Sequence, residues 1–498
     1  MENTKDLISK AKELYGSRNY FDAKSQLFLA LQDPEIDEIT KYKIYILIAD
    51  VCFKINEFEN TERYLLKYVE KYNLNSELSN WLGNTYLKRR DYKNSEKFYL
   101  KSIKLDNNET ALINLAILYH NLGNQKKAIS LYNEILTKNS KNIGALYNLS
   151  NLDKSIINKK TLNFLEDLIR ENKLNNFDTA SCYFLLAENE KNKKNFKSEI
   201  ELLSKANNYS FKEKEKKNKQ VNEYWLNVIP KKFNEIRYSS NKNSLNKIDK
   251  IFPIFIVGLP RCGSTLVESI ISSGKDEVEN LGETNLVNWA FLNTNRDILY
   301  NSIKEEKKIS IDFDKTANRL KNSFSNLNIK KNDKIFFSEK SLENFYYIEL
   351  ILNIYPNAKF INPYRNLIDN IFAIYKQFLS NVSWSHSLED ILLYIDNYLS
   401  TINYFKQKYH NNIFSISLEN FTNNPKKLSM EMYEFCNLGW DKKCLEFHKR
   451  KDLFINTASN NQIRNSVQKY DSGKYQYYKQ MLNPYLKKYD WINLELKN

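Results

Sequence analysis

The stretch IFPIFIVGLPRCGSTLVESI, residues 251–270, constrains the fold of this chain more than any other part of it. It begins with an apolar run, residues 251–257, that is too short for a helix and is typical of a buried strand. Two glycines and a proline follow, and an apolar pattern at helical spacing starts after Ser264 and Thr265. The stretch therefore predicts a strand, a tight turn and a helix, the basic unit of an α/β domain.

The turn has the pattern G-x-x-x-x-G-S-T, from Gly258 to Thr265. This is close to the nucleotide-binding P-loop, G-x-x-x-x-G-K-[ST], with Ser264 in place of the lysine. In a P-loop that lysine and a Mg²⁺ ion neutralise the charge of a triphosphate. The backbone N–H groups at the start of a helix favour a phosphate even without the lysine, so the pattern predicts an anion site of a different kind.

Short β-like runs alternate with helical patterns throughout the second half of the chain. Further strands are predicted at KIFFSEK (334–340), AKFINPYR (358–365) and IFSISLENF (413–421). Helices are predicted over residues 264–274 (closed by Gly274), 342–355, 366–379 and 387–410, and from Pro425 onward. Such alternation indicates a parallel sheet with right-handed crossovers, and ligands of such sheets bind at the carboxyl ends of the strands.

Basic side chains stand at these predicted strand ends. Arg261 follows the first strand, Lys340 ends the second and Arg365 ends the third. Because the carboxyl ends of parallel strands share one edge, we expect the three cations to gather around the start of the helix at Ser264. Their charge strengthens the prediction of a phosphate site.

The first half of the chain repeats itself at an offset of 33 residues. LGNTYLKRRDYKNSEKFYLKSIKLDNN, from Leu82, aligns with LAILYHNLGNQKKAISLYNEILTKNSKN, from Leu115. Small or pivotal residues recur at Ala11, Ala49, Gly83, Ala116, Ser150 and Ala187. Small side chains permit close approach of helices, so the pattern predicts six helix pairs in a curved α-solenoid. It resembles the tetratricopeptide repeat (TPR), most clearly in the two middle units.

The composition narrows the class of protein. Gly (10) and Pro (8) are scarce among 498 residues, which favours a mostly helical chain. The net charge of +15 comes from lysines interspersed with acidic residues, and we expect no nucleic-acid partner.

The five cysteines form no C-x-x-C pair, so we expect neither a disulfide framework nor a zinc site. No signal-like start or run of 18 apolar residues occurs, so we expect no membrane span and a cytoplasmic protein.

Five segments of the second half resemble a known family in the same order along the chain. They are PRCGSTL (260–266), LGE (281–283), SEK (338–340), PNAKFINPYRN (356–366), and TASNNQIR (457–464) with DSGKY (471–475). Together they resemble the sulfotransferases that use 3′-phosphoadenosine-5′-phosphosulfate (PAPS), over about residues 251–490. The tyrosylprotein sulfotransferases share several of these pieces. Repeats ahead of such a domain are similar to the TPR-containing sulfotransferases.

The resemblance implies roles for individual residues. Glu283 would be the general base, while Lys340 and Arg261 would stabilise negative charge during transfer. The cofactor-binding residues would be Pro260, Arg261, Cys262, Gly263, Ser264, Thr265 and Leu266 around the 5′-phosphosulfate, Arg365 at the 3′-phosphate, and Ser459 and Lys474 further along. PAPS carries less charge at this loop than a triphosphate does, which accounts for the missing lysine. We therefore expect no metal ion.

Two positions differ from the pattern of that family. Ala373 stands where the family usually has a serine, so one hydroxyl contact to the 3′-phosphate is missing. Cys262 stands where the family usually has a small residue, often serine. We interpret Cys262 as a spacing residue and not as a nucleophile.

We therefore predict an α + α/β protein: a TPR α-solenoid over residues 3–210, a connector over 211–250, and a P-loop-like α/β sulfotransferase domain with a parallel sheet over 251–498. It would transfer the sulfuryl group of PAPS to an acceptor hydroxyl of a peptide tyrosine, a glycan or a small molecule. The repeats would bind a protein partner or the acceptor. Two alternatives stay open. A Mg²⁺-dependent nucleotide kinase is disfavoured by Ser264. A TPR scaffold with a decayed transferase domain is favoured by Ala373 but opposed by the retention of Arg261, Glu283, Lys340 and Arg365.

Overall fold

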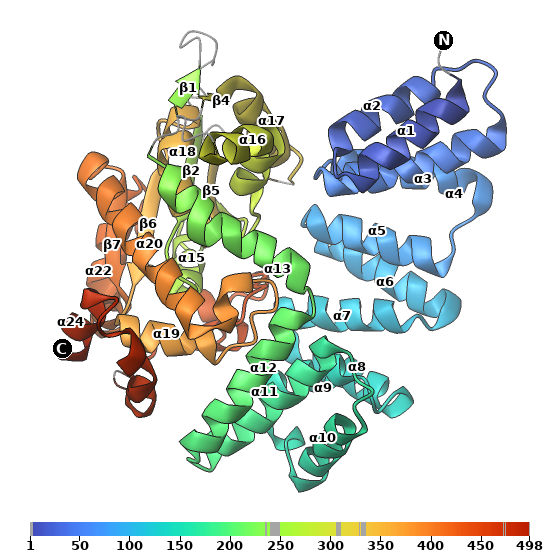
Figure 1. The fold of residues 1–498 in the computed structure, drawn as a ribbon. Coiled ribbons are helices and arrows are strands. Elements are labelled where there is room, and N and C mark those ends of the chain that lie inside the picture. Colours follow the sequence, from blue (N-terminus) through green and yellow to red (C-terminus); the bar gives the residue numbers. More distant parts are fainter. Residues whose placement is uncertain are drawn as a thin grey trace. The chain divides into compact units, whose positions relative to one another are not determined.

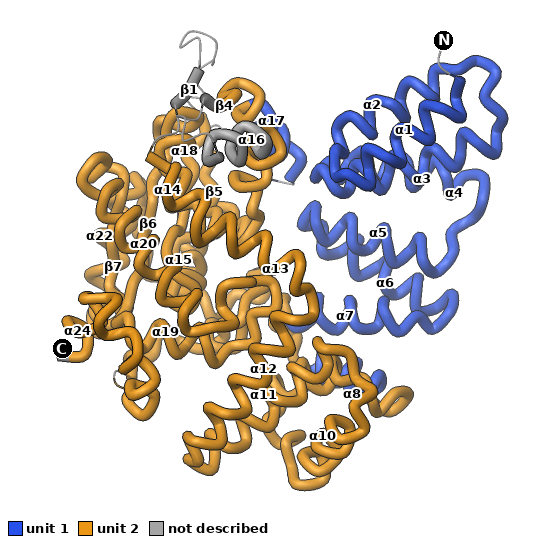
Figure 2. The backbone as a smooth tube through the Cα atoms, in the orientation of Figure 1, with its two compact units in different colours: residues 1–120, 126–135, 318–329 blue, residues 121–125, 136–317, 330–498 orange. Residues whose placement is uncertain are grey.

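The computed structural model describes residues 3–234, 237–239, 250–304, 310–327, 329, 335–471, 473 and 475–497. Its backbone divides into two compact units (Figure 2). Unit 1 contains residues 1–120, 126–135 and 318–329, and unit 2 contains residues 121–125, 136–317 and 330–498. Unit 2 thus holds the last repeats together with most of the α/β part. This division does not test the boundaries at residues 210 and 250, which stay predictions.

Six consecutive helix pairs occupy the described residues from Thr4 to Lys212 (Figure 1). They are α1 (Thr4–Gly16) with α2 (Tyr20–Ala30), α3 (Glu38–Lys54) with α4 (Phe58–Tyr72), α5 (Ser76–Lys88) with α6 (Tyr92–Asp106), α7 (Glu109–Asn121) with α8 (Gln125–Lys138), α9 (Ile143–Leu152) with α10 (Lys159–Glu171), and α11 (Asn176–Asn192) with α12 (Phe196–Lys212). The predicted pairs are confirmed, and the short helix η1 (Lys154–Ile156) joins the fifth pair.

The small residues that revealed the repeat lie on the first helix of each pair, and all six are buried. Gly83 of α5 shows why they must be small. A Cβ atom at Gly83 would lie 2.5 Å from the ring of Tyr99, which is itself completely buried in α6. Close helix approach is therefore the physical basis of the repeat pattern.

The chain remains helical after the last pair. Helix α13 (Glu215–Asn222), the π-helical segment η2 (Glu223–Val228) and α14 (Ile229–Lys232) follow α12. The lysines of residues 214–219 are exposed, whereas the backbone oxygen of Leu226 accepts a hydrogen bond of 3.0 Å from Asn397. This part of the predicted connector is thus a helix packed into unit 2.

A five-stranded parallel sheet forms the centre of unit 2, with strand order β3-β5-β2-β6-β7. Its strands are β2 (Ile251–Ile256), β3 (Val278–Asn280), β5 (Ile335–Glu339), β6 (Lys359–Tyr364) and β7 (Ile413–Ser417). The predicted parallel sheet is confirmed. Strand β3 is not among the predicted strands, since three residues are too few for an alternating pattern. A second, two-stranded sheet joins β1 (Arg237–Ser239) to β4 (Ser310–Asp312).

Helices cover both faces of the five-stranded sheet, as neighbouring residues of β6 show. Ile361 packs in an apolar cluster with Val267 of helix α15 (Ser264–Ile271). The next residue, Asn362, accepts a hydrogen bond of 2.7 Å from the hydroxyl of Tyr398 in helix α20 (Leu388–Lys408). Because side chains alternate along a strand, α15 and α20 lie on opposite faces.

The remaining helices connect the strands. They are α15 (Ser264–Ile271), α16 (Leu286–Lys304), α17 (Phe313–Ser325), η3 (Leu342–Tyr347), α18 (Ile348–Ile354), α19 (Leu367–Tyr375), η4 (Ser383–His386), α20 (Leu388–Lys408), α21 (Leu418–Asn423), α22 (Pro425–Phe435), η5 (Lys442–Lys449), α23 (Asn460–Ile463), η6 (Gln476–Tyr485) and α24 (Asp490–Lys497). Within the described ranges, none of the chain's helices is both long enough and apolar enough to cross a membrane.

The prediction that Gly274 closes the first helix is wrong. Helix α15 ends at Ile271, and the φ angle of Gly274 does not lie in the left-handed region. A Cβ atom at Gly274 would lie 2.5 Å from the hydroxyl oxygen of Tyr433. The glycine is therefore required by the close approach of this tyrosine, which packing across the fold decides and a local pattern cannot show.

Candidate active site

The loop after β2 leads directly into α15 and presents the start of that helix. Gly263 caps α15 with a left-handed φ of 95° and makes no side-chain hydrogen bond to the helix. A Cβ atom there would also lie 2.8 Å from Leu418, so both backbone and packing require glycine. The first N–H groups of α15 have no intrahelical acceptor, so the start of this helix can accept an external anion.

Arg261 lies in this loop and reaches across to a distant segment. Its Nη1 donates a hydrogen bond of 2.5 Å to Ser459 Oγ, and its Nη2 donates one of 3.4 Å to Gln462 Oε1. Its Nε is buried and has no hydrogen-bond partner among the described residues. Burial lowers the pKa of Arg261, and the nearby guanidinium of Arg365 lowers it further.

Arg365 follows β6, as predicted, and lies against the same loop. Its Nη1 donates a hydrogen bond of 3.0 Å to the backbone oxygen of Arg261, and its Nη2 donates one of 2.7 Å to that of Asp369. The ring of Tyr470 lies 5.2 Å from its Cζ atom. Within the described parts of the chain, neither Arg261 nor Arg365 forms an ion pair with a carboxylate. Among the described residues, the site therefore holds two positive charges that form no ion pair with an acidic side chain.

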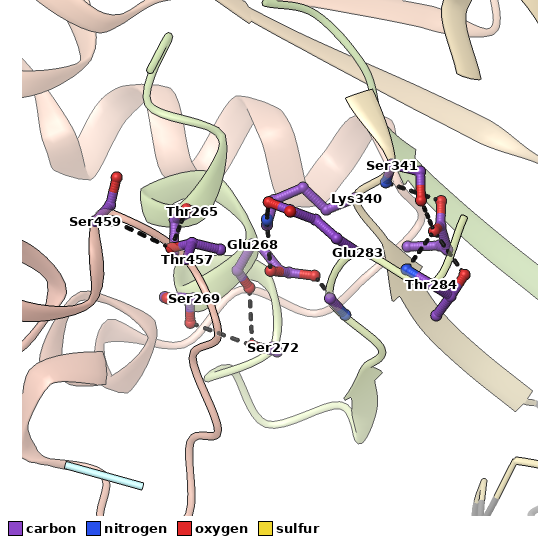
Figure 3. A network of polar contacts seen from close by, with 12 residues as sticks. Thr265, Glu268, Ser269, Ser272, Glu283, Thr284, Lys340, Ser341, Thr457 and Ser459 are labelled. Atoms are coloured by element: carbon purple, nitrogen blue, oxygen red, sulfur yellow. Dashed lines mark hydrogen bonds and ion pairs between the residues drawn. The ribbon is translucent and has the colours of Figure 1, made fainter. Parts of the chain in front are cut away.

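A second group of charges lies where β5 ends. The ammonium of Lys340 donates a hydrogen bond of 2.7 Å to Glu283 Oε1 and lies 3.9 Å from Glu268 Oε2 (Figure 3). Lys340 is completely buried, whereas half of the Glu283 side chain is exposed. Burial lowers the pKa of Lys340, but the two carboxylates outweigh it, so the net shift is upward.

Glu268 is a member of this group that the sequence reasoning missed. Its Oε1 accepts a hydrogen bond of 3.1 Å from the backbone N–H of Gly282, next to Glu283. Burial raises the pKa of Glu268 to about 7, although Lys340 opposes the shift. A signal was present, since Glu268 stands in the buried apolar stripe of α15 between Val267 and Ile270. A carboxylate at such a position needs a polar partner.

Glu339 holds the segment of Glu283 in place. Its carboxylate accepts hydrogen bonds from the backbone and hydroxyl of Thr284, from the backbone and hydroxyl of Ser341, and from the amide of Asn344. Strand β3 pairs with β5, which brings Gly282 to the backbone N–H of Lys340 at 2.9 Å. These contacts account for the meeting of Glu283 with Lys340, 57 positions later in the chain.

The other predicted site residues have separate surroundings. The carbonyl of Pro260 accepts a hydrogen bond of 2.6 Å from Asn370, and Thr265 lies 3.2 Å from Thr457, oxygen to oxygen. Burial raises the pKa of the Cys262 thiol to about 11. Leu266 packs against the apolar cluster under the sheet. The predicted Lys474 lies outside the described residues.

Ala373 and a cavity lined in part by Arg365 belong to the surroundings of the site. Ala373 is buried in α19, so no hydroxyl is present at that position. A cavity of 310 Å³ lies behind the loop, lined by residues that include Cys262, Asn362, Arg365, Tyr398 and Lys406. Neither Glu283 nor Lys340 lines it, so this cavity is distinct from the meeting point of the charged groups.

Comparison with known proteins agrees with this architecture. Residues 253–442 match the model of the sulfotransferase family, and residues 76–109 and 110–142 each match a tetratricopeptide repeat. The chain therefore carries a sulfotransferase-family domain together with tetratricopeptide repeats. The two matched repeats are the middle units in which the sequence pattern is clearest.

The chain also resembles individual proteins. An uncharacterized protein of Aquifex aeolicus (strain VF5) is 25% identical over 343 residues, which are 64% of this chain and 42% of that protein. This chain thus spans less than half of the relative's length. Among solved structures, the sulfotransferase domain of the Synechococcus PCC 7002 olefin synthase has 13% identity, a TM-score of 0.31, and coverage of 47% of this chain and 90% of its own. A sulfotransferase from Alicyclobacillus acidocaldarius has 15% identity, a TM-score of 0.27, and coverage of 46% and 91%.

Proposed function

We propose that the chain is a PAPS-dependent sulfotransferase that acts on an acceptor hydroxyl. The observation that carries the proposal is the pair Arg261 and Arg365 beside the start of α15. Each has a buried Nε without a hydrogen-bond partner in the described residues, and neither is paired with a carboxylate there. Both side chains are half-buried. A partly desolvated positive charge is stabilised by an anionic partner, so the pair favours a ligand with more than one anionic group.

The residues of the loop fit the donor that the resemblance implies. The uncapped N–H groups of α15 would hold the 5′-phosphosulfate, with Ser264 and Thr265 supplying hydroxyl groups. Arg365 would hold the 3′-phosphate, because a guanidinium matches phosphate geometry with two parallel hydrogen bonds. Ser459, already in contact with Arg261, would border the same donor.

The charged groups at the end of β5 supply the chemistry. When bound, PAPS supplies a sulfuryl group that passes to the acceptor oxygen, while the electron pair of the broken S–O bond stays on the phosphate of adenosine 3′,5′-bisphosphate. Glu283 would accept the proton of the acceptor hydroxyl, which its half-exposed position allows. Lys340 would stabilise the negative charge that develops on the leaving oxygen, a kind of interaction worth roughly 3–4 kcal/mol.

Peptide tyrosine, a glycan hydroxyl and a small molecule are all compatible with Glu283 as the base. Tetratricopeptide repeats are extended binding surfaces, so we propose that they bind a protein partner or the acceptor itself.

Calorimetric titration with adenosine 3′,5′-bisphosphate in the absence of metal tests the donor class. We expect micromolar binding by the wild type, about 100-fold weaker binding by Arg365→Ala, and an intermediate loss for Arg365→Lys, which keeps the charge but not the forked geometry. ATP with Mg²⁺ is the competing ligand. If ATP with Mg²⁺ binds and the bisphosphate does not, a kinase is favoured. If neither ligand binds, a scaffold with a decayed transferase domain is favoured.

A further inference from the structure

Residues 121–125, which are the three-residue turn between the helices of the fourth repeat and one flanking residue on each side, contact the segment that carries Thr457 and Ser459. The backbone oxygen of Asn121, the last residue of α7, accepts hydrogen bonds of 2.9 Å from the N–H of Ile455 and 2.7 Å from Arg464 Nη2. The side-chain amide of Asn121 donates to Asn456 Oδ1 at 3.1 Å. The last carbonyls of a helix have no intrahelical donor, so the end of α7 is a natural acceptor for these groups.

Arg464 closes this segment into a compact loop. Besides Asn121, its guanidinium donates to the backbone oxygen of Leu453 at 2.9 Å and to Asn460 Oδ1 at 3.2 Å. The fifth repeat adds a further contact, because Asn461 donates a hydrogen bond of 2.6 Å to the backbone oxygen of Asn151 in α9. Two successive repeats therefore hold residues 453–464.

The same segment also contacts the loop before α15 and the first turn of that helix. Thr457 lies 3.2 Å from Thr265, and Ser459 accepts the hydrogen bond from Arg261. A continuous series of contacts thus joins the end of α7, through Arg464 and the segment, to the start of α15.

Gly123 shows that the repeat is adapted to this contact. In five of the six helix pairs the joining turn has three residues, and its middle residue has a left-handed φ. In the other four such turns the middle residues are Arg18, Asn56, Arg90 and Lys194, with φ between 59° and 65°. The turn therefore tolerates a side chain. A Cβ atom at Gly123, however, would lie 2.7 Å from Arg464 Cζ, so Arg464 and not the backbone requires the glycine.

We propose that residues 121–125, with the end of α9, are a structural part of the donor-binding site. Asn121 and Gly123 are positioning residues: they hold Arg464, and through it Thr457 and Ser459, against the loop that binds the donor. This inference rests on the proposed function and deepens it. The repeats then set the affinity for the donor, in addition to binding a partner or an acceptor.

The test compares Gly123→Asn with Lys194→Asn. Both put asparagine, which tolerates left-handed backbone, at the same turn position. Only Gly123→Asn pushes against Arg464, because Lys194 is exposed in its own turn. Amide hydrogen exchange of residues 453–464 without ligand, and calorimetric titration with adenosine 3′,5′-bisphosphate, are measured on both variants and the wild type.

We expect Gly123→Asn to lose exchange protection across residues 453–464 and to bind the bisphosphate about tenfold more weakly, while Lys194→Asn matches the wild type in both. In a Ser459→Ala background the effect of Gly123→Asn on affinity should shrink, since the segment then has no hydroxyl to offer Arg261. Unchanged exchange, or lost protection with unchanged affinity, would overturn the inference. A wild type that binds no bisphosphate would overturn the proposed function itself, whatever the exchange shows.

Discussion

Glu283 covers Lys340: the two are joined by a hydrogen bond of 2.7 Å, yet Lys340 is completely buried and Glu283 is half exposed. The proposed base therefore shields the cation that would stabilise the leaving oxygen. A ligand that contacts the ammonium of Lys340 would compete for it with the carboxylate of Glu283.

This arrangement predicts a separation between turnover and binding in Glu283→Gln. The variant keeps the size of the side chain but cannot accept a proton, so we expect transfer to fall by about 10²- to 10⁴-fold. Affinity for adenosine 3′,5′-bisphosphate should be unchanged or higher, since Lys340 then keeps only Glu268 as an ion-pair partner among the described residues. Release of the bisphosphate from PAPS in the presence of an acceptor, and calorimetry, measure the two quantities. Glu277→Gln, on an exposed residue before β3, is the control, and turnover within twofold of the wild type in Glu283→Gln would contradict the role of base.

The buried carboxyl of Glu268 predicts a pH-dependent stability. Burial raises its pKa to about 7, compared with about 4.3 in an unfolded chain. Between these values the folded protein keeps a proton that the unfolded chain releases, so the contribution of Glu268 to stability falls as pH rises through this window. Glu268→Gln carries no charge at any pH. Its stability relative to the wild type should therefore increase by about 2 kcal/mol between pH 5 and pH 8. Melting temperatures of both proteins at the two pH values measure this change, and parallel curves would refute the assignment.

Ala373 predicts a gain of donor affinity on substitution. If α19 positions this residue as the resemblance implies, Ala373→Ser supplies the missing hydroxyl to the 3′-phosphate held by Arg365. One added hydrogen bond to a charged group is worth about 1.5 kcal/mol, or about tenfold in affinity for adenosine 3′,5′-bisphosphate. Adenosine 5′-monophosphate, which has no 3′-phosphate, is the control ligand. An equal gain for both nucleotides would show that the hydroxyl does not contact the 3′-phosphate.

The packing of Gly83 on Tyr99 predicts a loss of stability in Gly83→Ala. The new methyl group would lie 2.5 Å from a buried ring, and overpacking of this kind costs about 1–3 kcal/mol. Gly16→Ala is the matched control in the same unit, because a Cβ atom there meets nothing within 4 Å. We expect a lower melting temperature for Gly83→Ala and an unchanged or higher one for Gly16→Ala, since alanine favours helix over glycine. Equal melting temperatures would contradict the packing argument.

Most of the fold could be predicted from local sequence signals. The six helix pairs follow from small residues that recur every 33–38 positions. Four of the five strands in the main sheet follow from short apolar runs bounded by turns. Strand β3 was missed because three residues carry no periodicity, and Gly274 was misread because its neighbour, Tyr433, is remote in sequence. The roles predicted for the site residues remain predictions.

The sequence by itself determined the repeat, the parallel α/β part and the charged residues at the strand ends, because helix and strand periodicity and turn chemistry are local properties. Only the tertiary structure decided which of those residues meet. Burial of Glu268 beside Lys340, the cover that Glu283 provides, and the contact of Gly123 with Arg464 all depend on segments tens to hundreds of residues apart. Such contacts are set by packing and by the satisfaction of buried polar groups, which no periodicity of the chain records.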